Sequence, residues 1–241
     1  MVSHNSLKTS PHTSSRAEWE AWRARRLASV ISPTGNLALI ETRWFPPEVT
    51  LEEARAGQPT TVTVTKQERR DFDGNIVAQG IRLWDSNSEA IRSFETIDSY
   101  PFDPAWAFEA TFTPHPESHA VPFEYVRETP GLRNLAVPGE IKVTIDGLEY
   151  SLDAFDDDGT LLLVFADPTN GHETYPAGRF LVLPKEENSN RVIIDFNRAY
   201  VPPCGFSIAY NCPLPPRQNR LKVPVHAGEK NPIFRNNFEI H

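Results

Sequence analysis

Apolar and polar positions alternate with a period of two along much of this 241-residue chain. The alternating segments are rich in β-branched and aromatic residues, which is typical of half-buried strands. They span 60–67, 80–84, 90–97, 107–113, 122–127, 139–145, 148–152 and 161–166. Asp-Gly pairs at 73–74, 146–147 and 158–159 predict hairpin turns. The pattern predicts a mainly β fold, a single antiparallel barrel- or sandwich-like domain.

Only the N-terminal region has a helical period. Ser15 and Glu18 match a capping box. The apolar residues Trp19, Trp22, Leu27 and Val30 then fall on one stripe, with Arg16, Arg23 and Arg25 off it. We expect an amphipathic helix over 15–31 whose tryptophans pack onto the β domain, the alternative being a partner-binding helix. Residues 1–14 are polar and predict a disordered tail, leaving 15–241 as one β-rich domain.

Composition excludes several classes of protein. The net charge of −8 and the pI near 5.4 argue against a nucleic-acid partner, because neutralising phosphates requires a basic face. The sequence has no apolar run long enough for a membrane span and no secretory signal at its start, so we expect a cytoplasmic protein. The 22 prolines outnumber the 12 glycines, which predicts many corners fixed by proline. The oligomeric state is left open.

The most informative stretch is 165–229, where the short apolar strands 179–183 and 191–196 lie among Asp, Asn, Arg, Thr, Tyr and Pro residues. Rigid proline corners with charged and amide side chains are suited to holding a polar site. Sequential strands usually pair. We therefore expect 179–183 to pair with 191–195, which would bring Arg179 close to Asp195 as an ion pair.

The same stretch resembles the family of proteins of unknown function known as DUF1684. The matching motifs are Asp167 to Tyr175, Gly178 to Leu181, Asp195 to Tyr200, Pro202 to Cys204, Cys212 to Pro216, Asn219 to Leu221 and Ala227 to Glu229. Weaker upstream matches are Arg82, Asp85, Tyr100, Pro101 and Trp106, together with the N-terminal helix. The resemblance implies a fold type and a site region but no reaction.

Arginine side chains are the candidate anion anchors in this sequence. Arg82, Arg179 and Arg198 can each offer a fork of donors to a carboxylate or phosphate. The alternative is internal pairing with Asp195, Asp167 or Asp85, which would only lock loops. The remaining candidate ligand-binding residues lie in the same polar segments: Asp85, Thr169, Tyr175, Asn197 and Asn219.

Asp167 and Asp195 are the candidate catalytic carboxylates. Asp167 follows the apolar strand 161–166 and opens the turn Asp-Pro-Thr-Asn-Gly, a place where site carboxylates often lie. A role as general acid or base would require a raised pKa.

Seven residues separate Cys204 from Cys212, and no second close pair of metal ligands accompanies them. Reduced structural thiols, a disulfide, a metal site and a catalytic thiol all remain open, and we expect neither a bound metal nor a cofactor.

Three functions are compatible with these residues. The first is binding of a small polar or anionic molecule in a pocket formed by the region 165–229. The second is a hydrolase- or lyase-like enzyme in which an Asp is the general acid or base and arginines hold the substrate. The third is a purely structural polar network. The sequence leaves open whether the protein is an enzyme.

Overall fold

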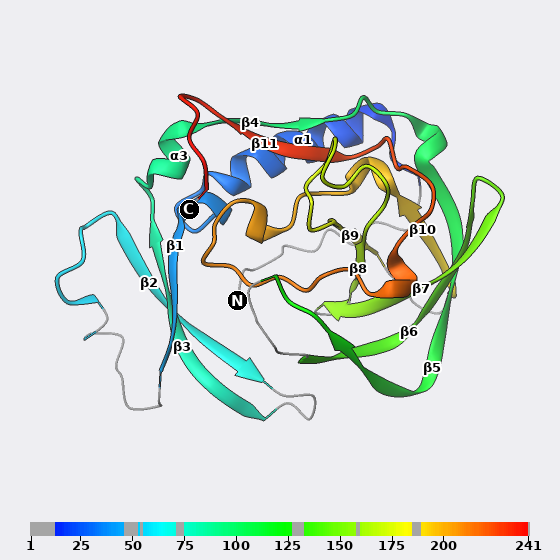
Figure 1. The fold of residues 1–241 in the computed structure, drawn as a ribbon, viewed down its shortest axis with the longest axis horizontal. Helices are drawn as coiled ribbons and strands as arrows, with labels where there is room; N and C mark the ends of the chain where they lie inside the picture. The colour runs from blue at the N-terminus through cyan, green and yellow to red at the C-terminus, as the bar shows by residue number, and fades with distance from the viewer. Residues whose placement is uncertain are drawn as a thin grey trace.

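The structure is a computed structural model that describes residues 13–45, 53, 55–70, 75–126, 133–157, 160–184 and 189–240. Its largest element is a six-stranded antiparallel sheet with the order β10-β5-β6-β7-β8-β9 (Figure 1). The strands are β5 Ala107–Phe123, β6 Arg133–Ile145, β7 Leu148–Asp157, β8 Thr160–Phe165, β9 Arg179–Leu183 and β10 Arg191–Asp195. The edge strands β9 and β10 approach each other, so the sheet is nearly closed and barrel-like. The mainly β, antiparallel prediction is confirmed.

The hairpin of β6 and β7 shows how the local sequence sets this sheet. Asp146 and Gly147 both have positive φ (49° and 74°), as a tight two-residue hairpin turn requires. Ile145 then pairs with Leu148 at the end of the ladder. Because side chains alternate across a strand, Ile141, Val143 and Ile145 are buried inside the sheet while Lys142 and Thr144 are exposed.

Two strand predictions need correction. Residues 90–93 of the predicted strand 90–97 belong to a short helix, α3 Glu89–Ser93, because Ser88 caps it by accepting the Ile91 amide; the strand β4 Phe94–Ser99 follows. The predicted strand 107–113 continues to Phe123 in one element, β5, which takes in only residues 122–123 of the predicted strand 122–127 and has an irregularity in its register between Pro114 and His119.

A separate three-stranded sheet stands beside the barrel, on the left of Figure 1. Its order is β1-β3-β2, with β1 Leu39–Phe45, β3 Ile76–Asp85 and β2 Val62–Arg70. The third sheet pairs β4 with β11 Glu229–Phe234 across the top of the view. The sequence pattern predicted neither β1 nor β11.

The predicted N-terminal helix is present as α1 Arg16–Val30, with the capping box of Ser15 and Glu18 formed. Trp19 donates from Nε1 to the carbonyl of Asn197 at 2.9 Å, and its ring lies 5.8 Å from that of Phe102. The helix therefore docks on the β domain, as expected, rather than standing free.

Several predicted features lie outside the described residues: the turns at 73–74 and 158–159, residue 127, and residues 1–12 of the predicted tail. Ser14 is buried, with its amide 3.4 Å from an Asp195 carboxylate oxygen. Within the described ranges, no helix is long and apolar enough to cross a membrane.

Candidate functional site

The turn that follows β8 is closed by the Asp167 carboxylate. Its Oδ1 accepts the amide and the hydroxyl of Thr169 at 2.9 and 2.7 Å, and the amide of Val225 at 3.1 Å. The Thr169 and Thr174 hydroxyls lie 2.8 Å apart, and Asn170 holds the turn from its other side by donating to the Tyr175 carbonyl. Asp167 is buried, so its bonding capacity is used within the turn.

Arg179 is completely buried and binds this turn from β9. It donates to the other Asp167 oxygen at 2.8 Å and to the carbonyls of Val225, Ala227 and Glu229. Neither side chain of the Arg179–Asp167 pair is exposed. The glycine before it, Gly178, has a φ of 91°, and a Cβ there would lie 2.6 Å from the Phe165 carbonyl, so only glycine suits this approach. Internal pairing therefore holds for Arg179.

Asp195 and Asn197 form a second satisfied cluster at the end of β10. One Asp195 oxygen accepts the backbone and side-chain amides of Asn197 at 3.1 and 2.9 Å. Asn197 in turn exchanges two hydrogen bonds with the backbone of Asp103. These bonds fix the loop before β5 to the loop after β10.

Asn219 and Asp85 also bind backbone groups. Asn219 is fully buried and makes three hydrogen bonds, two to the backbone of Asp153 and one to the Val164 carbonyl. Asp85 accepts the amide of Asn87 and so closes the turn after β3. The Asn219 and Asp85 side chains therefore both stabilise loops.

The expected contact of Arg179 with Asp195 is wrong, as is the pairing of their strands. β9 pairs with β8, and β10 pairs with β5, so the two strands form opposite edges of the sheet. The Arg179 guanidinium lies 5.3 Å from the Phe165 ring, and that ring lies 5.2 Å from Phe196, the residue after Asp195. Aromatic side chains thus fill the space between the two polar clusters.

Sequence reasoning missed a second buried ion pair. The Glu229 carboxylate is completely buried, accepts Arg26 Nε at 3.2 Å and accepts the Val201 amide at 2.8 Å. Arg26 also donates to the Val201 carbonyl, and Arg23 donates to that of Ile97. The signal was the Glu of the Ala-Gly-Glu motif at 227–229, to which the sequence analysis gave no role. These arginines fasten α1 to the body.

Arg82 differs from every arginine described above. Its guanidinium lies 5.2 Å from the Tyr210 ring and 5.8 Å from the Trp84 ring. Its Nε is buried with no hydrogen-bond partner, as is Arg179 Nε, but the other nitrogens of Arg179 have acceptors. No ion pair or side-chain hydrogen bond joins it to any described residue, so pairing with Asp85 is not observed. Desolvation by burial lowers its pKa from the usual arginine value, opposed by Tyr210 and then by Cys212.

Thr42 lies directly across from Arg82, in β1, and Thr65 lies across from it on the other side, in β2. Directly opposed residues share one face of a sheet. The Thr42 hydroxyl is buried and has no partner, whereas the Thr65 hydroxyl accepts Trp84 Nε1 at 2.8 Å. This face therefore carries two adjacent polar groups, on Arg82 and Thr42, whose hydrogen bonding is incomplete.

Arg198 shares one property with Arg82, a buried Nε without a hydrogen-bond partner. It follows Asn197 in the short 3-10 turn Phe196–Arg198 and is half-buried. No aromatic ring flanks it among the described contacts, so it is the weaker of the two candidate anion anchors.

The two cysteines are buried thiols that no disulfide joins. The Cys204 amide donates to Cys212 Sγ at 3.3 Å, and the Tyr175 hydroxyl donates to Cys204 Sγ at 3.6 Å. The segment that links the two cysteines carries Tyr210, whose ring lies beside Arg82. In the described part of the chain, no group of three or more metal-ligating side chains comes together.

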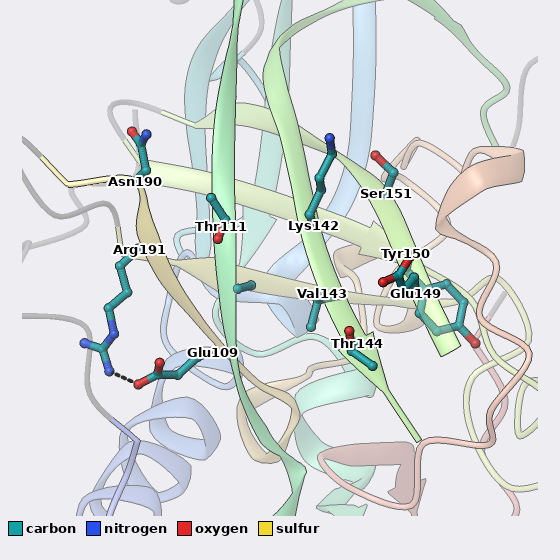
Figure 2. A pocket seen from close by; sticks show the side chains of 11 residues that line it. Glu109, Thr111, Lys142, Val143, Thr144, Glu149, Tyr150, Ser151, Asn190 and Arg191 are labelled. Atoms are coloured by element: carbon teal, nitrogen blue, oxygen red, sulfur yellow. Dashed lines mark hydrogen bonds and ion pairs between the residues drawn. The ribbon is translucent and has the colours of Figure 1, made fainter. Parts of the chain in front are cut away.

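Figure 2 shows an open polar depression on the outer face of β10, β5, β6 and β7. Its volume is about 770 Å³, and its charged groups include Glu109, Lys142 and Arg191. Arg191 pairs with Glu109, and Lys142 pairs with Glu140. Since these exposed pairs neutralise Arg191 and Lys142, neither cation is left unpaired for an anionic ligand in the depression.

Comparison with known proteins bears on the family only. Residues 92–230 match the model of a family described as "Protein of unknown function (DUF1684)". The chain is also similar to the solution NMR structure of an uncharacterized protein from gene locus rrnAC0354 of Haloarcula marismortui. The identity is 30% and the TM-score 0.48, over 57% of this chain and 77% of that chain. No functionally curated protein matches.

Proposed function

We propose that this chain, which belongs to the DUF1684 family of proteins of unknown function, binds a small anionic molecule at Arg82. The observation that carries the proposal is the absence of any counter-ion for Arg82 among the described residues. Arginine keeps its charge at neutral pH. A desolvated, unpaired charge is costly to a folded protein, and a bound anion would remove that cost.

The neighbours of Arg82 suit an oxyanion. The guanidinium offers a planar fork of N–H donors, and the Thr42 hydroxyl can add an O–H donor from the adjacent strand. Carboxylates, phosphates and sulfates each present several acceptor oxygens to such donors. The Trp84 and Tyr210 rings exclude water from the flanks, which strengthens a charged hydrogen bond.

Acid–base catalysis is less well supported by the same geometry. Both oxygens of Asp167 are bonded within a buried turn, and Asp195 is occupied by Asn197 and Ser14. A general base needs an oxygen that a substrate proton can reach. The buried polar residues Asp167, Arg179, Asp195 and Asn219 are then best understood as structural supports of the loops that they bond.

Thermal shift of the purified protein against a library of carboxylates, phosphates and sulfates tests this proposal. A ligand at 100 times its Kd adds about 2.7 kcal/mol of stability, which is easily detected. The hit is then titrated by calorimetry into three variants: Arg82→Met, Arg198→Met and Arg43→Met. Arg43 is the matched control, since it lies on the same small sheet but is exposed and paired with Glu41.

We expect binding to be lost in Arg82→Met and retained in the other two variants. If Arg198→Met loses the ligand while Arg82→Met binds as the wild type does, the site lies at Arg198 and the proposal is wrong. If no anion in the library raises the melting temperature of the wild-type protein, that result also counts against the proposal.

A further inference from the structure

We propose that Cys204 and Cys212 form a dithiol that a peroxide oxidises reversibly to an intramolecular disulfide. The two residues are in direct contact in the thiol form, because the Cys204 amide donates to Cys212 Sγ at 3.3 Å. A disulfide requires Cα atoms about 4.4–6.8 Å apart and Cβ atoms directed toward each other. Cys212 Sγ already lies against the Cys204 backbone, and the proposal requires that rotation of the Cys204 side chain bring its sulfur onto Cys212 Sγ.

The surroundings assign different roles to the two sulfurs. Cys212 lies close enough to Arg82 for the two to interact electrostatically, and a neighbouring cation favours the nucleophilic thiolate. Cys204 instead receives a hydrogen bond from the Tyr175 hydroxyl. Cys212 is therefore the thiol that attacks the oxidant, and Cys204 is the thiol that resolves the product.

The reaction balances with one peroxide per protein. The Cys212 thiolate attacks a peroxide oxygen, the O–O bond breaks, and Cys212 becomes a sulfenic acid as hydroxide leaves and takes up a proton to form water. The Cys204 thiol then attacks the sulfenic sulfur, an S–S bond forms, and a second water leaves. Two sulfurs lose one electron each, the peroxide gains two, and a dithiol reductant reverses the change.

Both thiols are buried, but the segment between them reaches the surface. Ile208 is 44% exposed, while Cys204 and Cys212 are 2% and 5% exposed. Buried thiols are inert as a rule, so the proposal requires that this segment open to admit a peroxide. Formation of the disulfide does not depend on anion binding, because it rests on the contact of the two cysteines, whereas the choice of Cys212 as the nucleophile rests on Arg82.

The test treats the reduced full-length protein with equimolar hydrogen peroxide, unfolds it with an alkylating reagent present, and measures the intact mass. We expect a mass lower by two hydrogen atoms, no alkylation until a dithiol is added, and a peptide linking Cys204 to Cys212. Cys204→Ser should instead trap sulfenic acid at Cys212, detected with a dimedone probe. Two thiols that remain fully alkylated, or over-oxidation without a linked peptide, would overturn the proposal.

The pH profile of the oxidation rate tests the role of Arg82. Arg82→Met should move the rise in rate to higher pH and slow the reaction several-fold at neutral pH, whereas Arg43→Met should leave both unchanged. An unaltered profile in Arg82→Met would show that Arg82 does not favour the Cys212 thiolate.

Discussion

Arg179 donates to Asp167 across 2.8 Å with neither side chain exposed, and this pair fastens β9 to the turn that follows β8. The guanidinium also donates to three backbone carbonyls, so its charge is compensated on several sides. Arg82 has the opposite arrangement, with aromatic rings on its flanks and no acceptor among the described residues. The contrast separates a structural arginine from one that is available to a ligand.

Replacing Arg179 by Met should destabilise the protein severely. The change leaves the Asp167 carboxylate and three carbonyls without their donor in a dry interior, and breaking a buried pair from one side costs about 3–5 kcal/mol. Urea unfolding measures the loss. The double variant Arg179→Met with Asp167→Leu should be less destabilised than the two single changes together, and strict additivity would show that the pair is not coupled.

Arg82→Met should have the opposite effect, leaving the free energy of unfolding unchanged or raising it in the absence of ligand. An unpaired, desolvated cation is replaced by an apolar side chain of similar length, which fits between Trp84 and Tyr210. The same urea experiment checks this, with Arg43→Met as the control. A loss comparable to that of Arg179→Met would mean that Arg82 has a structural partner.

The strands were predictable where the local pattern is strong, and their partners were not. Alternation and the Asp146-Gly147 turn specify the β6–β7 hairpin without reference to the rest of the chain. The pairing of β10 with β5 joins segments far apart in sequence. Nothing local encodes such a choice, so the rule that sequential strands pair holds for β8 with β9 but gives the wrong partner for β10.

The residues of the candidate site were likewise predictable only in part. Residue type identified Arg82, Arg179 and Arg198 as anion anchors, but only the fold tells which has an internal acceptor. Asp167 reaches Arg179 because β8 and β9 are neighbours. The role of Thr42 depends on the register of β1 against β3, and β1 itself was not predicted. Its hydroxyl could not have been found from the sequence.

Trp19→Ala should loosen α1 from the body. The change removes the hydrogen bond to the Asn197 carbonyl and the contact with Phe102. Trp19 is only half-buried, so the cost should fall below the ~3–5 kcal/mol of a fully buried tryptophan. Hydrogen exchange within 16–30 should accelerate. If exchange there is unchanged, the arginine contacts alone hold the helix.

The phenols of Tyr100 and Tyr210 should ionise at a higher pH than an ordinary tyrosine. Burial is the main cause that raises the pKa of Tyr100 and the pKa of Tyr210 to about 12 each. For Tyr100, the hydrogen bond to Glu173 raises the pKa further. For Tyr210, the Arg82 cation acts against the rise in pKa. In both cases the folded pKa exceeds the unfolded value of 10.0. Their contribution to stability is therefore fully present below pH 10 and is lost as the pH rises toward 12.

Absorbance titration of the phenolates measures this, with Tyr210→Phe and Tyr100→Phe removing one late group each. In Arg82→Met, the Tyr210 phenol should ionise at still higher pH, because the cation that favours its phenolate is gone. A Tyr210 titration that does not respond to Arg82→Met would contradict the contact between them.

Anomalous diffraction from crystals soaked in sodium iodide tests the central claim most directly. Iodide reports where the protein presents donors to an anion whatever the natural ligand is. The account predicts a peak beside the Arg82 guanidinium and the Thr42 hydroxyl that is absent from Arg82→Met crystals. Iodide bound at Arg198 or at exposed cations, with the position beside Arg82 empty in the wild-type protein, would contradict it.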